Sequence, residues 1–298
     1  MNRRKFIYNS SIASLSVLGL NSCNQLFRDV KITILHSNDV HSQIEPFPLN
    51  HNRFPGRGGF ARRASIFNEI RSVNPNTLIF DAGDIFQGTP YFNFFQGELE
   101  LKLMKEMGYN AATIGNHEFD AGLDTLKRNI LSTNFQFIIS NYDFVNTELE
   151  GLTTPYKIYK KEGVKIGVFG LGIELRGLVN PILYKETKYY DPIEISNEMV
   201  KILKDEKKCD LIICVSHLGH EYNFNKISDT KLARLTSDID LIIGGHTHTF
   251  LNKPVIIKNK KNNNVIINQV GSGGVYLGRI DFNFTNSSKI DTNSLLEV

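Results

Sequence analysis

The sequence predicts an α/β fold in which helices cover sheets of buried strands. Along its 298 residues, short apolar runs alternate with stretches of helical periodicity. The apolar runs are continuous, which is typical of strands that are covered on both faces. Hydrophobic residues make up 41% and charged residues 22%, a balance that supports an ordinary globular core. Because composition shows no break and no internal repeat, we expect one domain over residues 24–298.

The expected elements follow from these patterns in chain order. Strands are expected at residues 31–35, 78–80, 111–114, 137–140, 164–171, 211–215 and 241–243, with further β runs between 255 and 284. Helices are expected at residues 59–73, 99–107, 120–130, 195–205 and 231–237. Gly108 closes the second helix, because glycine readily adopts the left-handed conformation that ends helices. The polar run at 258–264 is interpreted as a hairpin tip.

Residues 1–23 have the pattern of an export signal. Basic residues at 3–5 precede a short, mostly apolar stretch at 6–20, too short and too polar for a permanent membrane span. The sequence Leu-Asn-Ser-Cys that ends at Cys23 resembles a bacterial lipoprotein signal, and the arginine pair resembles a twin-arginine signal. We expect an exported cell-envelope lipoprotein, periplasmic or on the outer surface and anchored by lipid at Cys23; the alternative is an ordinary cleaved signal peptide.

The other two cysteines are expected to be structural. Cys209 and Cys214 flank the strand at 211–215 and stand five residues apart. Residues at that spacing on an extended strand point to opposite faces and lie too far apart for a disulfide.

Polar clusters rich in Asp, His and Asn follow directly on five of the expected strands. In sheets of this kind ligands bind beyond the carboxyl ends of the strands, so the five loops should meet at one edge. The clusters are Asn38-Asp39-Val40-His41, Gly83-Asp84, Gly115-Asn116-His117-Glu118, Ser216-His217 and Gly244-Gly245-His246-Thr247-His248.

These side chains have the chemistry of a divalent-metal site. In an extended segment, residues two apart face the same side, so we expect Asp39 with His41, and His246 with His248, to reach one site. A carboxylate such as Asp84 can bridge two cations. Mixed carboxylate, amide and imidazole ligands suit Mn, Fe, Co, Zn or Ni. The candidate ligands are Asp39, His41, Asp84, Asn116, His217, His246 and His248.

Each motif is weak alone, but the ordered set NDVH, GD, GNHE, SH and GGHTH is specific. It resembles the calcineurin-like metallophosphoesterase superfamily and, more narrowly, the catalytic domain of the secreted 5′-nucleotidase family. Further support comes from the stretches at 34–42, 58–62, 81–89, 115–120 and 240–246. The resemblance covers nearly all of the chain from residue 30, and it implies a four-layer α/β/β/α sandwich of two mixed sheets flanked by helices.

The resemblance also implies a role for each ligand. Asp84 would bridge the two metals. Asp39, His41 and His248 would complete the first site, and Asn116, His217 and His246 the second. Many members of the nucleotidase branch have glutamine where this chain has His248; histidine also coordinates, so the departure bears on metal preference.

The implied chemistry is phosphoester hydrolysis. Two divalent cations would hold a bridging water and lower its pKa toward neutrality, so that a hydroxide attacks phosphorus. His117 would offset the charge that develops on the phosphoryl oxygens. Asp120, three residues later, would accept a proton from His117 and orient its ring. His220 could either support the ligands or be an ordinary loop histidine.

Several alternatives concern partners and substrate. The chain ends at Val298, whereas full-length nucleotidases continue into a domain that binds the nucleoside. We therefore expect either a broad phosphomonoesterase or the catalytic half of a split nucleotidase that needs a separate nucleoside-binding chain. A 2′,3′-cyclic phosphodiesterase and a non-enzymatic, lipid-anchored metal-binding scaffold are further alternatives, although His117 and Asp120 favour an enzyme.

Other partner and function classes find little support in the sequence. The net charge of +3, without a basic stripe, argues against nucleic-acid polymers as partners. No H-E-x-x-H motif supports a metalloprotease. The aromatic run at 91–95 is interpreted as core or a contact surface for another domain, with a pocket wall as the alternative.

Overall fold

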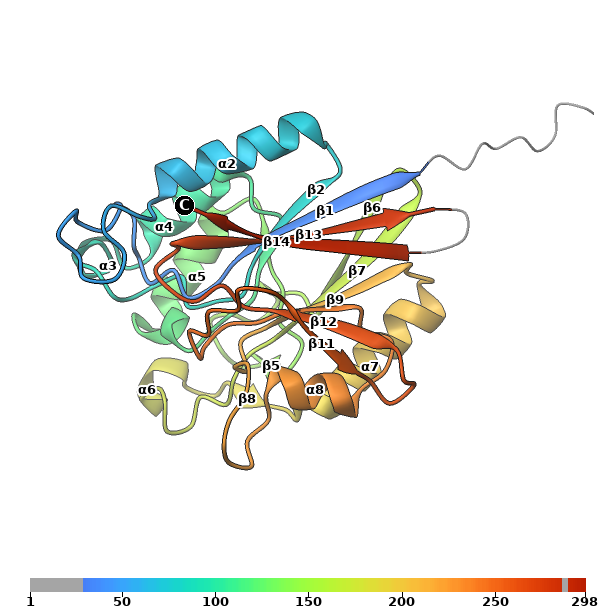
Figure 1. Cartoon of the computed structure of the whole chain (residues 1–298). Coiled ribbons are helices and arrows are strands. Elements are labelled where there is room, and N and C mark those ends of the chain that lie inside the picture. The colour runs from blue at the N-terminus through green and yellow to red at the C-terminus, as the bar shows by residue number, and fades with distance from the viewer. Residues whose placement is uncertain (1–28, 286–288) are drawn as a thin grey trace, which may run out of the picture.

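Two six-stranded sheets lie face to face, and helices cover their outer surfaces (Figure 1). The structure, a computed structural model, describes residues 29–285 and 289–298. The expected signal at 1–23, with Cys23, lies outside the described residues. Two large mixed sheets flanked by helices confirm the fold class that the sequence predicts.

The first sheet has the strand order β14-β13-β1-β2-β3-β4 and the second the order β11-β12-β10-β9-β7-β6, while β5 and β8 form a small ribbon. The strands are β1 Val30–Ser37, β2 Thr77–Asp81, β3 Ala111–Ala112, β4 Gln136–Phe137, β5 Tyr142–Asp143, β6 Tyr156–Lys161, β7 Val164–Leu171, β8 Lys188–Tyr189, β9 Leu211–Ser216, β10 Leu241–Ile243, β11 Val255–Lys258, β12 Asn264–Asn268, β13 Tyr276–Phe284 and β14 Lys289–Glu297. The helices are α2 Phe60–Val73, α3 Pro90–Phe95, α4 Glu98–Met107, α5 Gly122–Ser132, α6 Pro181–Tyr184, α7 Pro192–Val200 and α8 Asp229–Leu235.

The strands are apolar on both faces because both faces are covered. On β1, Ile34 points into the layer between the sheets, and its neighbour Leu35 points outward under the helices. Phe67 of α2 belongs to the outer core of the first sheet, and Leu232 of α8 to that of the second. This arrangement explains the continuous apolar runs, and it leaves polar residues to collect where the strands end.

Parallel pairing sets the direction in which the strands end. β1, β2 and β3 run parallel in the first sheet, and β7, β9 and β10 run parallel in the second. The polar loops that follow β1, β2, β3, β9 and β10 therefore start from carboxyl ends of parallel strands, as the sequence predicts.

Several predicted boundaries are wrong. The strands expected at 111–114 and 137–140 are reduced to two residues each, because the chain turns early into loops, and β6 was not expected at all. The helix expected at 195–205 begins at Pro192, capped by Asp191, and ends in a π-helix at Lys201–Glu206. The helix expected at 231–237 instead begins after Ser228, whose hydroxyl accepts from the Lys231 backbone.

Two other predictions, the hairpin tip and the unpaired cysteines, are confirmed. The polar run at 258–264 is the tip of the β11–β12 hairpin, where Lys258 pairs with Asn264. Cys209 and Cys214 are buried and free of any disulfide. Among the described residues, no helix is both long enough and apolar enough to cross a membrane.

Candidate metal centre

Hydrogen bonds donated by backbone amides connect the polar loops to one another. The Asp39 amide donates to the Gly83 carbonyl at 2.9 Å, and the His41 amide donates to the Asp84 carbonyl at 3.1 Å. The His246 amide, from the other sheet, donates to both carboxylate oxygens of Asp39, at 2.9 and 3.0 Å. The loops of the two sheets therefore meet in one place.

Asp39, His41 and His248 form the first group of candidate ligands, with one atom of each lying within 4.8 Å of the others. Their contacts are close: His41 Nε2 lies 2.9 Å from His248 Nε2, and His248 Nε2 lies 3.4 Å from Asp39 Oδ1. His41 Nδ1 lies 3.2 Å from the Phe86 carbonyl oxygen, to which it can only donate. In the neutral ring this leaves the lone pair on Nε2, aimed at the cluster.

Asp84, His217 and His246 form the second group, within the same distance limit. His217 Nε2 lies 3.0 Å from Asp84 Oδ2, and His246 Nδ1 lies 2.9 Å from Asn116 Oδ1. A third group joins Asp84 to His41 and His117, so Asp84 has oxygens within reach of both sides. All seven predicted ligands are thus brought together by the structure.

A divalent cation fits this donor set, as the buried His217 shows. Its Nδ1 lies 2.6 Å from the Ala82 carbonyl oxygen and therefore donates the ring proton. Nε2 is buried without a hydrogen-bond partner among the described residues and faces a carboxylate. Burial lowers the pKa of His217, but the Asp84 carboxylate outweighs burial and raises that pKa to about 10. The space between His217 Nε2 and the Asp84 carboxylate therefore favours a positive charge. A divalent cation would supply that charge and leave the His217 ring neutral, as a metal ligand must be.

The backbone of the ligand loops departs from the extended form that the sequence reasoning assumed. Asp39, His41, Asp84, His246 and His248 all have positive φ, between 48° and 73°. Such values are uncommon for residues other than glycine and typically mark functional sites. Both pairs reach the one cluster: Asp39 and His41 lie in the same group, and His246 and His248 lie in adjacent groups, as the resemblance implies. Only the assumed extended backbone was wrong.

Glycines allow the loops to approach closely. A Cβ on Gly115 would lie 2.3 Å from Asp84 Oδ1, and one on Gly245 would lie 2.8 Å from His217 Nδ1. Of the four glycines in the predicted clusters, Gly83, Gly115, Gly244 and Gly245, only Gly83 has a positive φ, at 84°. Lack of a side chain matters more here than freedom to turn.

His117 and Asp120 form a pair beside the cluster. His117 Nδ1 lies 2.7 Å from Asp120 Oδ2, and the His117 ring packs edge-on against His41 at 5.2 Å. The turn His117–Phe119 is a 3₁₀-helix rather than the start of an α-helix, and it still aligns residues three apart. Burial lowers the pKa of His117, but the hydrogen bond to Asp120, with the charge of Asp84, raises it above its ordinary value.

Comparison with known proteins identifies the family. The sequence profile described as calcineurin-like phosphoesterase matches residues 32–250. The chain belongs to this family.

Relatives agree with the match. The chain is 31% identical to the snake venom 5′-nucleotidase of Gloydius brevicauda, over 89% of this chain and 47% of that protein. It is 33% identical to the 5′-nucleotidase of Vibrio cholerae, over 86% of this chain and 49% of that protein. The crystal structure of a 5′-nucleotidase precursor from Thermus thermophilus superposes with a TM-score of 0.80 at 29% identity, over 90% of this chain and 55% of that one.

The resemblance stated from the motifs is therefore confirmed, and membership makes the chain a metal-dependent phosphoester hydrolase by class. The chain spans about half the length of these relatives.

One residue of this phosphoesterase that sequence reasoning gave no role is Glu118. Its carboxylate is buried and accepts backbone N–H groups from two ligand loops: Oε2 from Asp84 at 2.9 Å and Gly115 at 2.6 Å, and Oε1 from Ile85 at 2.7 Å. Burial, with the Asp84 charge, raises its pKa to about 7. Its place in the motif Gly115-Asn116-His117-Glu118 was the only sequence signal.

A second support lies under His217. The buried Asp229 accepts from Ser216 Oγ at 2.6 Å, and that hydroxyl in turn accepts from the Leu218 backbone at 3.2 Å. His220 is tied to the site through its backbone, which donates to Thr247 Oγ1 at 2.9 Å. In the described part of the chain, His220 Nδ1 is buried without a hydrogen-bond partner and so does not support a ligand, which fits a loop histidine better.

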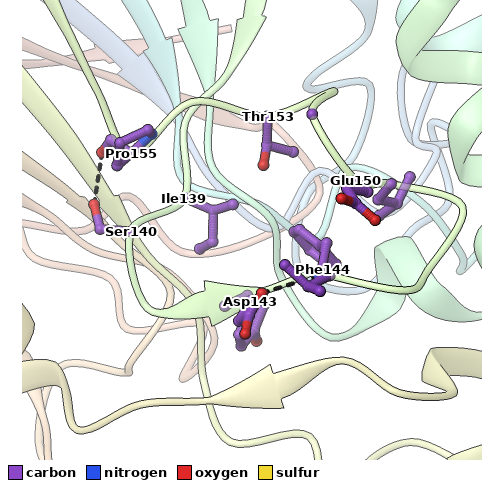
Figure 2. Close-up of a pocket in the computed structure, with 11 residues that line it drawn as sticks. Ile139, Ser140, Asp143, Phe144, Glu150, Thr153 and Pro155 are labelled. Atoms are coloured by element: carbon purple, nitrogen blue, oxygen red, sulfur yellow. Dashed lines mark hydrogen bonds between the residues drawn. The ribbon is translucent and has the colours of Figure 1, made fainter.

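Two of the hollows on the described part of the molecule have no candidate ligand in their lining. A cavity of about 240 Å³ lies beside β5, and in its lining Ser140 already donates to the Pro155 carbonyl (Figure 2). A groove of about 750 Å³ is lined by α3 and residues 43–48. Helix α3 has no fully buried residue, and its aromatic side chains divide between two roles: Phe92 packs against the core, whereas Tyr91, Phe94 and Phe95 line the surface groove.

Proposed function

We propose that the chain is a two-metal phosphomonoesterase, related in substrate to the 5′-nucleotidases, with the seven clustered side chains as its ligands. The observation that carries the proposal is that Asp84 belongs to two ligand groups at once, with the His117–Asp120 pair beside them. A shared carboxylate is the arrangement that two neighbouring cations require. The metals would come from the set Mn, Zn, Fe, Co and Ni, which suits imidazole and carboxylate together.

In this proposal the protein supplies positioning and charge. Bound cations would acidify a water and neutralise phosphoryl oxygens. His117, protonated through its bond to Asp120, offsets negative charge on the phosphoryl oxygens as the ester bond breaks. Asp120 keeps the proton on His117 Nδ1 and so orients the ring. The backbone of His117 donates to Asp84 Oδ1 at 2.9 Å, which links the orientation of this pair to the shared carboxylate.

The test is a metal-loaded assay of p-nitrophenyl phosphate hydrolysis. Wild type should turn over, and removal of metal by a chelator should abolish activity until metal is restored. Absence of turnover with every metal of the set, in protein shown to contain two ions, would favour the scaffold alternative.

The proposal also concerns the substrate, which we propose to be a nucleotide. The relatives are named 5′-nucleotidases, and the chain aligns with about half of each. We propose that nucleoside selection needs a separate nucleoside-binding chain. The chain alone should then hydrolyse the aryl phosphate well and AMP poorly, and AMP turnover comparable to that of the aryl phosphate would overturn the need for a partner. Hydrolysis of 2′,3′-cyclic AMP in the same assay tests the diesterase alternative.

We also propose that residues 24–298 act as one catalytic domain, held at the cell envelope by lipid on Cys23. The support is the basic, then apolar, then Leu-Asn-Ser-Cys pattern of residues 1–23. Expression of the full chain in a bacterium should place wild type in the membrane fraction. Cys23→Ser should release it, and an unchanged distribution would contradict the anchor.

A further inference from the structure

A cationic, aromatic loop stands beside the second ligand group. Residues 219–227 follow His217 and are bonded to their surroundings at several points. The His220 backbone donates to Thr247 Oγ1 at 2.9 Å, the Tyr222 hydroxyl donates to the Leu218 carbonyl at 2.8 Å, and Lys231 Nζ donates to the Phe224 carbonyl at 3.3 Å. Since Thr247 lies between two candidate ligands, the loop is attached to the metal cluster itself.

Within this loop, the ammonium group of Lys226 lies over an aromatic ring. Lys226 Nζ lies 4.8 Å from the centre of the Tyr222 ring, and the Phe224 ring lies 5.3 Å from that of Tyr222. Phe224 is 59% exposed. The negative face of the tyrosine ring attracts a cation above it, so the ring stabilises the Lys226 ammonium at this position.

Lys226 lacks a close counter-charge. Within the described part of the chain, no carboxylate forms an ion pair with it, and Glu174 acts on it only from a distance. Its position beside the cluster follows from the Tyr222 ring beneath it, whose hydroxyl donates to the carbonyl of Leu218, the residue directly after the candidate ligand His217. An unpaired, partly buried cation beside a phosphoester site would attract an anion.

We propose that Lys226, supported by Tyr222, binds a second anionic group, a phosphate or carboxylate, on the leaving group of the phosphoester substrate. Among residues 29–285 and 289–298, the Lys226 ammonium forms no hydrogen bond or ion pair with a candidate ligand side chain, so it is free to contact a group other than the one at the cluster. It therefore suits a charge several bonds away from the phosphoryl group that is transferred. The inference rests on the proposed function, because it places that phosphoryl group at the metal cluster.

A matched pair of non-hydrolysable phosphonates tests the subsite. Benzylphosphonate carries one anionic group, and 4-(phosphonomethyl)benzoate adds a carboxylate at the far end of the ring. Titration calorimetry on the metal-loaded full chain should show about fivefold tighter binding of the benzoate, the scale of one partly exposed ion pair. In Lys226→Met the ratio of the two dissociation constants should fall to about one, and Lys226→Arg should restore it.

The control is Lys160→Met, which removes the same charge from an exposed position on β6. This variant should keep the wild-type ratio of the two dissociation constants. If the ratio fell as far as in Lys226→Met, the preference would come from the overall positive charge of the protein and not from Lys226, and the subsite would be overturned. Binding of benzylphosphonate without any preference for the benzoate would overturn the subsite and leave the proposed function standing. Failure of metal-loaded wild type to bind either phosphonate would overturn both.

Discussion

The candidate ligand residues are held in strained backbone conformations. Asp39, His41, Asp84, His246 and His248 have φ values that cost roughly 1–3 kcal/mol each for residues other than glycine. Hydrogen bonds between the loops offset this cost, among them the paired contacts from the His246 backbone to Asp39. The site is therefore shaped before any cation binds, which favours affinity.

The His117–Asp120 pair predicts a loss of turnover without a loss of metal. His117→Ala should lower kcat about 10²–10³-fold, because it removes a positive charge that matters most in the transition state. Asp120→Asn should lower the pKa of His117, since the carboxylate bond raises it, and should shift the alkaline limb of the pH–rate profile to lower pH. Metal content by mass spectrometry should stay at the wild-type value in both. A profile unmoved in Asp120→Asn would contradict the role given to that residue.

Glu118 predicts a loss of metal affinity from a residue that touches no metal. In Glu118→Gln, an amide NH₂ would face backbone N–H groups that now point at a carboxylate, and the loops of Asp84 and Gly115 should shift. Affinity should fall about 10–100-fold, the usual cost of losing a group that supports ligands. Chelator competition measures this, with the exposed Glu106→Gln as the control. Equal affinities in the two variants would show that Glu118 does not position the loops.

The candidate ligands could be predicted because the sequence alone shows both their residue type and their position directly after a predicted strand. The role of Glu118 could not be predicted, because the backbone N–H groups that it accepts, from residues 84–86 and 115, come close to it only when two loops fold together. The left-handed backbone was missed because Asp and His, although enriched in that conformation among residues other than glycine, still adopt it in only a minority of cases, so their identity does not predict it.

At the scale of elements, β1 joins the metal site to both sheets. Its buried His36 lies opposite Gly278 of β13, where a Cβ would approach His36 Nε2 to within 1.9 Å. The Asn268 amide of β12, in the other sheet, donates to the same nitrogen at 3.0 Å. The ring thus bridges the sheets in its neutral form.

His36 predicts a pH dependence of stability. Burial lowers its pKa to about 3, whereas the unfolded chain takes up a proton near pH 6.5. Between these values only the unfolded state is protonated, so the free energy of unfolding should fall as pH falls, by up to about 1.4 kcal/mol per unit from this group. Urea unfolding of metal-free protein at pH 7, 6 and 5 measures the slope. His36→Gln should flatten it relative to wild type and to His51→Gln, and parallel slopes in all three would contradict the assignment.

Element boundaries were the least predictable part of the fold. β3 and β4 keep only two residues each, because the chain leaves the sheet early to build the loop of Asn116 and the bridge between Ile138 and Thr154. Apolar sequence continues past both strand ends, since the following residues are buried by tertiary packing. Hydrophobicity records burial and does not distinguish strand from buried loop.

At the scale of the whole molecule, two sheets each contribute half of a site. The first sheet supplies Asp39, His41, Asp84 and Asn116, and the second supplies His217, His246 and His248. The apolar layer between them, which includes Ile34, Phe80 and Ile213, sets their separation. Substitutions in that layer should therefore affect metal binding as well as stability.

The central claim is that one shared carboxylate, Asp84, lies between two cations. Anomalous diffraction from crystals soaked in Mn²⁺ tests it most directly. We predict two peaks about 3.5–4 Å apart, one beside Asp39, His41 and His248, the other beside Asn116, His217 and His246, with Asp84 between them. A single peak, or two peaks that do not share Asp84, would contradict the two-metal centre.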